Sequence, residues 1–169
     1  DDKQDTLKSN FVIDFEKLKQ INSDVVGWIT IDSTNINYPV LQSEDNEYYL
    51  HKNYLKEYSQ SGSIFLDSNC SDFEDNHIVI YGHNMKDGSM FETLSNVLQK
   101  WWYEDSINYI LTFTTSTETI EYQVFSTYSI EAEDYYIKTS FKNDNEYLDF
   151  IKKIKSRSNH DYGIELTKD

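Results

Sequence analysis

Hydrophobic residues in the first part of the chain change from helical to strand-like spacing. In residues 11–22, Phe15 and Leu18 belong to an apolar stripe whose members lie three or four positions apart, which predicts an amphipathic helix. Residues 25–31, VVGWITI, and 36–42, INYPVLQ, are two runs with strand-like composition, separated by the polar segment DSTN. Because such a polar segment is typical of a turn, the two runs predict a pair of neighbouring strands.

Two shorter apolar runs predict further strands. Residues 62–67, GSIFLD, have strand composition, and residues 77–81, HIVIY, form a continuous apolar run. A continuous run is the pattern of a strand that is covered on both faces. Pro39 lies inside the strand predicted over 36–42, and its missing N–H predicts that this strand is an edge strand or is interrupted there.

The second half of the chain again alternates between helical and strand patterns. Residues 89–101 carry apolar residues at helical spacing, and Ser89 with Glu92 three positions later resembles a capping box. The remaining predicted elements are two strands over 109–115 and 119–130, joined by the turn STE, and a helix over 145–156. This order predicts an α+β fold with a mostly antiparallel β core and short inserted helices.

Composition and charge limit the domain organisation and the partners. The chain has 169 residues, of which 38% are hydrophobic and 15% aromatic, so it can bury a sizeable core. We expect one domain over residues 11–169 and a flexible segment over residues 1–10. The net charge of −15 comes from 15 Lys and Arg against 30 Asp and Glu residues. This balance argues against a phosphate-binding surface and therefore against a nucleic-acid partner.

The cysteine content and the length of the apolar runs exclude further kinds of site. Cys70 is the single cysteine of the sequence, so neither an intrachain disulfide nor a CxxC metal site can form. No apolar run in the sequence reaches the ~18 residues of a membrane-spanning helix. A membrane anchor upstream of Asp1 stays open as an alternative.

One histidine lies at the end of a predicted strand. In HIVIYGHNMKDGSMF, residues 77–91, Gly82 permits an unusual backbone conformation and His83 follows it, before a polar loop. A histidine on a loop that a rigid scaffold supports suits a general acid–base or the ion-pair partner of a nucleophile, with a structural role as the alternative. A metal site shared by His77 and His83 would need a sharp reversal at Gly82, because residues six apart on a strand lie ~20 Å apart.

The histidine segment carries a family resemblance. YGHNMKDGSMFETL, residues 81–94, resembles the signature of class B sortases, the cysteine transpeptidases of Gram-positive cell surfaces. Four more segments fall in the order of that family: VVGWITIDSTNINYPVLQ, DNEYYL, GSIFLD and DYYIKTSF. The resemblance implies a sortase-like β-barrel with an N-terminal helix. It also implies an enzyme that cleaves a C-terminal sorting motif of secreted proteins through a thioester and joins them to a peptidoglycan amine.

The resemblance also implies a location and site residues. Such an enzyme works without a cofactor on the extracellular face of the cell membrane, held by an N-terminal anchor that these residues do not include. His83 corresponds to the catalytic histidine. Asn46 and Leu50 in DNEYYL, and Tyr136 and Ile137 in DYYIKTSF, correspond to walls of the groove for the sorting motif. The alternative for these four is a core or turn role.

The nucleophile of the family does not match any residue of this chain. In the family it lies in a strand reading roughly T-L-x-T-C after the last helix, with an arginine on the next strand, and no such segment occurs here. Cys70 lies among acidic residues that raise a thiol pKa, Thr115 in LTFTTS precedes the last helix, and Arg157 ends that helix. We therefore expect residues 11–169 to lack the C-terminal strands of the domain and to be inactive alone.

Two other functions stay open from the sequence. A non-catalytic extracellular module could use a sortase-like groove to hold a peptide. A metal-dependent hydrolase could use His77, His83 and nearby acidic residues.

Overall fold

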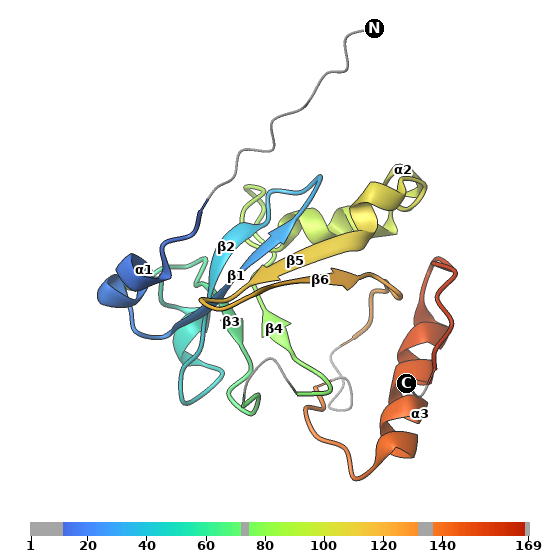
Figure 1. Ribbon diagram of the computed structural model, residues 1–169. Helices are drawn as coiled ribbons and strands as arrows, with labels where there is room; N and C mark the ends of the chain where they lie inside the picture. Colours follow the sequence, from blue (N-terminus) through green and yellow to red (C-terminus); the bar gives the residue numbers. More distant parts are fainter. Residues whose placement is uncertain (1–11, 72–74, 132–136, 168–169) are drawn as a thin grey trace, which may run out of the picture.

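A computed structural model of the chain describes residues 12–71, 75–131 and 137–167, which build a six-stranded sheet (Figure 1). The strands are β1 (Val25–Ile31), β2 (Asn37–Leu41), β3 (Ile64–Leu66), β4 (Ile80–Tyr81), β5 (Ile110–Thr114) and β6 (Thr119–Gln123). Their order is β4-β3-β2-β1-β5-β6, and β2 pairs with β3 in parallel while the other neighbours pair antiparallel. The predicted α+β class with a mostly antiparallel core is confirmed.

Helices lie around the curled sheet, with α1 and α3 on opposite sides of it in Figure 1. The α-helices are α1 (Phe15–Ile21), α2 (Lys100–Tyr103) and α3 (Asp144–Arg157), and the 3₁₀ helices are η1 (Tyr48–Leu50), η2 (Glu92–Leu98) and η3 (Ser106–Tyr109). Side chains cap both longer helices, because Asp14 accepts from the Lys17 N–H and Asn143 accepts from the Glu146 N–H. Within the described ranges, no helix combines the length and the apolar character that crossing a membrane requires.

Two clusters of buried apolar side chains cover the two faces of the sheet. The first cluster is Ile29, Ile31, Ile36, Val40, Ile64, Leu66, Cys70 and Phe113, and the second is Phe15, Val25, Leu41, Tyr49 and Phe65. Consecutive residues of β2 and β3 alternate between the clusters, as the two-residue period of a strand requires. A register shift between Val25 and Gly27 moves Val25 to the second cluster, although Ile29 of the same strand faces the first.

The expectation that Pro39 marks an edge or a break in its strand is wrong. β2 is continuous and lies between β1 and β3, with Pro39 opposite Trp28 of β1. The pairing of β2 with β3 begins only at Val40, which lies opposite Ile64. The missing N–H of Pro39 is therefore tolerated inside the sheet, because β3 does not pair with that position.

The run HIVIY forms a strand over only its last two residues, and the two faces of that strand are partly covered. Only Ile80 and Tyr81 pair with β3, opposite Leu66 and Phe65, and both are half-buried. β4 is an edge strand among the described residues, and Ile80 packs against the first cluster while Tyr81 packs against the second. Similarly, the strand predicted over 119–130 ends at Gln123, because its partner β5 begins at Ile110, opposite that residue.

The helix predicted over 89–101 is a 3₁₀ helix followed by a short α-helix. The two segments are separated by Gln99, whose backbone is extended. The predicted capping box is absent, because the Ser89 hydroxyl donates to Asp87 Oδ1 at 2.6 Å and the Glu92 N–H bonds to the Ser89 carbonyl.

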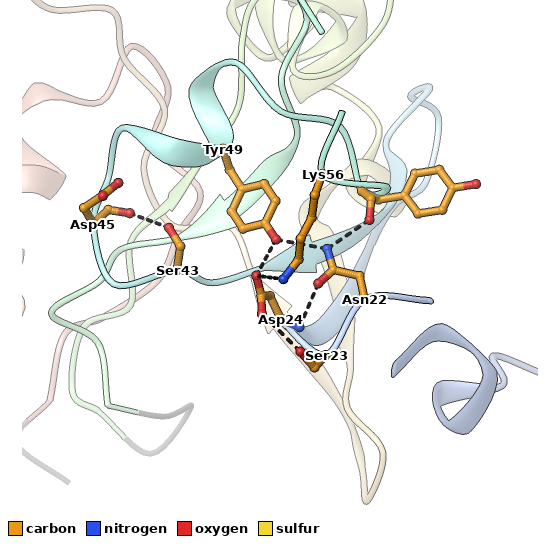
Figure 2. A network of polar contacts seen from close by, with 8 residues as sticks. Asn22, Ser23, Asp24, Ser43, Asp45, Tyr49 and Lys56 are labelled. Atoms are coloured by element: carbon orange, nitrogen blue, oxygen red, sulfur yellow. Dashed lines mark hydrogen bonds and ion pairs between the residues drawn. The ribbon is translucent and has the colours of Figure 1, made fainter. Parts of the chain in front are cut away.

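A network of hydrogen bonds connects η1 with the residues that follow α1 (Figure 2). Tyr49 is fully buried, and its hydroxyl donates to Asp24 Oδ2 at 2.6 Å and accepts from Asn22 Nδ2 at 2.9 Å. Lys56 pairs with the same Asp24 oxygen at 2.9 Å. Burial opposes the charged form of Asp24, but the hydrogen bonds from Tyr49 and Lys56 outweigh it and lower its pKa. The network therefore holds a charged carboxylate beneath η1.

We expect Tyr49→Phe to lower the free energy of unfolding by about 1–3 kcal/mol, since it removes a hydrogen bond to a charged group and leaves the ring in place. Urea unfolding measures the change. The matched control is Tyr58→Phe, because Tyr58 is 77% exposed and its loss of a hydroxyl should cost less than about 0.5 kcal/mol. Equal midpoints for the two variants would show that the network does not stabilise the fold.

Candidate active site

His83 lies where the loop after β4 meets the end of η1. Its Nε2 atom is 2.8 Å from the Leu50 carbonyl oxygen. Because a carbonyl oxygen only accepts hydrogen bonds, Nε2 carries the proton. In the neutral ring, Nδ1 is then the unprotonated nitrogen that is available to take a proton.

The chain positions His83 through close packing before it and a tight loop after it. A Cβ atom on Gly82 would lie 2.4 Å from Ile64 Cδ1 and 2.7 Å from Phe91 Cδ2. Glycine at position 82 therefore lets the side chains of Ile64 and Phe91 pack close to the backbone. The expected unusual backbone conformation is not observed, since Gly82 does not have a positive φ. The following loop folds back, since the Phe91 N–H bonds to the His83 carbonyl at 2.9 Å and Asn84 pairs with Met90.

A second histidine lies beside this site. The rings of His51 and His83 have centroids 6.3 Å apart, and His51 is exposed. His51 directly follows Leu50, so the segment that supplies the carbonyl to His83 also places this second ring next to it. The sequence around His51 contained no signal for this proximity.

One of the four predicted groove residues, Leu50, contacts His83, and Asn46 lies four residues before it on the same segment. Asn46 donates to Asp67 Oδ2 at 2.9 Å and accepts from the Ser68 N–H at 2.8 Å, so its side chain fixes the turn after β3. Leu50 packs against the second cluster while its carbonyl accepts from His83. Ile137 is 41% exposed and lies on the segment that leads to α3, and Tyr136 lies outside the described residues.

His77 has a structural environment. Its Nδ1 atom is 2.7 Å from the Lys138 carbonyl oxygen, and its ring packs against Phe150 at a centroid distance of 5.0 Å. Burial lowers the pKa of His77, which keeps the ring neutral at pH 7. In the described parts of the chain, no group of three or more His, Cys, Asp or Glu side chains is arranged to hold a metal ion.

Cys70 belongs to the first cluster and is 3% exposed. Burial is the main cause that raises the pKa of its thiol, and the charges of Asp67 and Asp75 add to it. A raised pKa disfavours the thiolate, which is the nucleophilic form. Cys70 is therefore an unsuitable nucleophile for chemistry at His83.

We expect iodoacetamide at pH 7.5 to alkylate Cys70 at least about tenfold more slowly in the folded chain than in 8 M urea, because reaction requires both exposure and ionisation. Intact mass spectrometry follows the modification. Equal rates in both conditions would contradict the burial of the thiol.

Thr115 and Arg157 have local structural roles. The Thr115 hydroxyl accepts from the N–H groups of Thr117 and Glu118 at 3.2 and 3.1 Å, which closes the turn between β5 and β6. Arg157 is the last residue of α3, and its guanidinium lies 5.8 Å from the centre of the Tyr128 ring. Neither contact brings these side chains to His83.

Comparison with known proteins gives a consistent result. A family model described as "Sortase domain" matches residues 29–154. "Sortase B" of Listeria monocytogenes is 39% identical over 151 residues, which are 89% of this chain and 61% of that protein. The chain therefore spans about three fifths of the length of that relative.

Solved structures share the fold described above. The "Staphylococcus aureus sortase B-substrate complex" superposes with a TM-score of 0.84 at 35% identity and covers 91% of this chain and 71% of that chain. A crystal structure of sortase B complexed with triglycine superposes with a TM-score of 0.85, also at 35% identity, and covers 91% of this chain and 72% of that one. Both are similar to the present chain over nearly its whole described length.

Proposed function

Because this chain belongs to the sortase family, we propose that it forms the histidine-bearing part of a class B transpeptidase. The reaction would cleave a C-terminal sorting motif of secreted proteins and join them to peptidoglycan. The observation that carries the proposal is the hydrogen bond from His83 Nε2 to the Leu50 carbonyl, which leaves Nδ1 free for proton transfer. A held histidine with one free nitrogen is the arrangement that acid–base catalysis requires.

The proposed chemistry needs a thiolate that faces His83. The thiolate attacks the carbonyl carbon of the scissile peptide bond, a C–S bond forms, and the C–N bond breaks as imidazolium Nδ1 gives its proton to the leaving amine. The acceptor amine then attacks the thioester, loses a proton to His83 and releases the thiolate. The family mechanism requires no cofactor for either step.

We propose that residues beyond Asp169 supply the nucleophilic cysteine and its arginine. Cys70 is the only cysteine of the 169 residues, and its burial and raised pKa count against it as the nucleophile. The chain covers 61% of the Listeria relative, which is therefore longer than the 169 residues. On this proposal the 169 residues alone do not turn over substrate.

The proposed substrate groove has one wall beside His83 and a second wall near α3. Asn46 and Leu50 form the first wall, which the contacts to Asp67 and His83 hold in place. Tyr136 and Ile137 form the second. Solved relatives bound to a substrate and to triglycine support a sorting peptide and an amine as partners. Such an enzyme would act on the extracellular face of the membrane, where both partners meet.

Incubation of the protein, extended past Asp169, with a fluorogenic sorting peptide and triglycine tests this function. We expect cleavage and a new peptide–triglycine product by mass spectrometry. Binding of the peptide without cleavage would favour the non-catalytic peptide-binding module. Neither binding nor cleavage over a panel of sorting motifs would refute the proposed function.

A further inference from the structure

A buried carboxylate lies between the two segments that meet at His83. Asp67 follows β3 and is fully buried. Its Oδ2 atom accepts from the Tyr81 hydroxyl at 2.6 Å and from Asn46 Nδ2 at 2.9 Å. Its Oδ1 atom accepts from the backbone N–H and the side-chain Nδ2 of Asn69 at 2.8 and 2.9 Å. These four donors are neutral groups.

Hydrogen bonds keep this carboxylate charged. Burial favours the protonated form, but the bonds from Tyr81, Asn69 and Asn46 outweigh that effect and lower the pKa of Asp67. A buried charge is tolerated only when its hydrogen-bonding capacity is filled, so loss of any donor is costly. The donors are therefore held firmly around Asp67.

Asp67 and His83 connect the same two chain segments at two different places. Tyr81 precedes His83 by two residues, and Asn46 precedes Leu50 by four. The bond from His83 to the Leu50 carbonyl joins the far ends of these two short segments. Asp67 joins their first residues, because it accepts hydrogen bonds from both Asn46 and Tyr81. The separation of the two segments is therefore fixed at both ends.

We propose that Asp67 is a positioning residue that acts through Tyr81 and Asn46 to hold His83 on the Leu50 carbonyl. It does not touch the reacting atoms. Its effect is to fix which ring nitrogen carries the proton, so that Nδ1 is the one presented to the reaction. The consequence for turnover rests on the proposed function, whereas the consequence for the histidine ring does not.

The state of the His83 ring can be read directly in the 169-residue chain. A ring N–H that is held by a hydrogen bond exchanges slowly with water, so the His83 Nε2 proton should give an NMR signal at pH 8. We expect Asp67→Asn and Tyr81→Phe each to increase its exchange rate about fivefold, the factor that corresponds to loss of a typical hydrogen bond. Tyr81→Phe removes one donor only, so it remains informative if Asp67→Asn does not fold.

The control is Tyr162→Phe, which removes a buried hydroxyl that contacts Thr127 at 2.7 Å. This variant should lose stability without changing His83 exchange. In the extended protein, Tyr81→Phe should lower kcat about tenfold and leave KM within about twofold, because the bond affects proton transfer more than substrate binding.

The outcomes separate the two proposals. Unchanged His83 exchange in both Asp67→Asn and Tyr81→Phe, or equal changes in Tyr162→Phe, would overturn the positioning role. Faster exchange in a protein that never cleaves peptide would support the positioning role and count against the proposed function. A fall in kcat with constant KM would support both.

Discussion

His83→Ala in the protein extended past Asp169 is expected to lower kcat/KM for a sorting peptide at least about 100-fold, the usual scale for loss of an acid–base group. The substitution removes the ring that forms the ion pair with the thiolate and the proton that the leaving amine needs. It also removes the hydrogen-bond donor to the Leu50 carbonyl. The fall in kcat/KM should come mainly from kcat, because the lost groups act in proton transfer and in the ion pair.

His160→Ala is the matched control for that experiment. His160 stacks on Tyr103 at a centroid distance of 4.4 Å and packs against Tyr162, in a separate part of the fold. Its removal should change kcat/KM by less than about twofold, whatever it does to stability. A His83→Ala enzyme with the activity of the His160→Ala control would refute the role assigned to His83.

Gly62→Ala is expected to have the largest effect on stability, about 3–5 kcal/mol. Gly62 has a φ of +57°, which strains other residues, and a Cβ there would lie 2.5 Å from both the Leu50 and the Tyr49 carbonyl oxygens. Those atoms are backbone and cannot move aside as a flexible side chain can. The Leu50 oxygen is also the acceptor for His83, so the substitution should displace the His83 ring.

Gly163→Ala separates steric overlap from backbone strain. Gly163 has a φ of +69°, but nothing lies within 4 Å of the position that its Cβ would occupy. It should lose only about 1–2 kcal/mol from the left-handed conformation. Urea unfolding of both variants measures the difference. Equal losses would show that the Leu50 carbonyl does not rest against Gly62.

Sequence patterns correctly predicted the elements that bury one face, because their apolar residues recur at a regular spacing. β1 occupies residues 25–31 as predicted, and α3 exceeds its predicted range by one residue at each end, because alternation and helical spacing report burial directly. β4 and η2 differ from prediction because their form depends on neighbours. An apolar run does not show how many of its residues pair with another strand, and only Ile80 and Tyr81 do so here. A capping box does not form when the Ser89 hydroxyl donates to Asp87 instead.

The sequence identified His83 and its motif, but it did not identify the residues that hold His83 in place. His83 was identifiable from Gly82 and from the resemblance of residues 81–94. The contribution of Asp67 depends on Asn46 and Tyr81, which lie 21 and 14 positions away in the sequence. The role of Leu50 was predicted as a groove wall, but its contact with His83 is made by the backbone carbonyl, which no side-chain pattern reports.

Identification of the acylated residue tests the central claim most directly. The extended protein is mixed with a sorting peptide without acceptor amine, quenched in acid, digested and mapped by mass spectrometry. We predict a thioester on a cysteine beyond Asp169, none on Cys70, and a strongly reduced yield in His83→Ala. An acyl group on Cys70, or an undiminished rate of acylation without His83, would contradict the account.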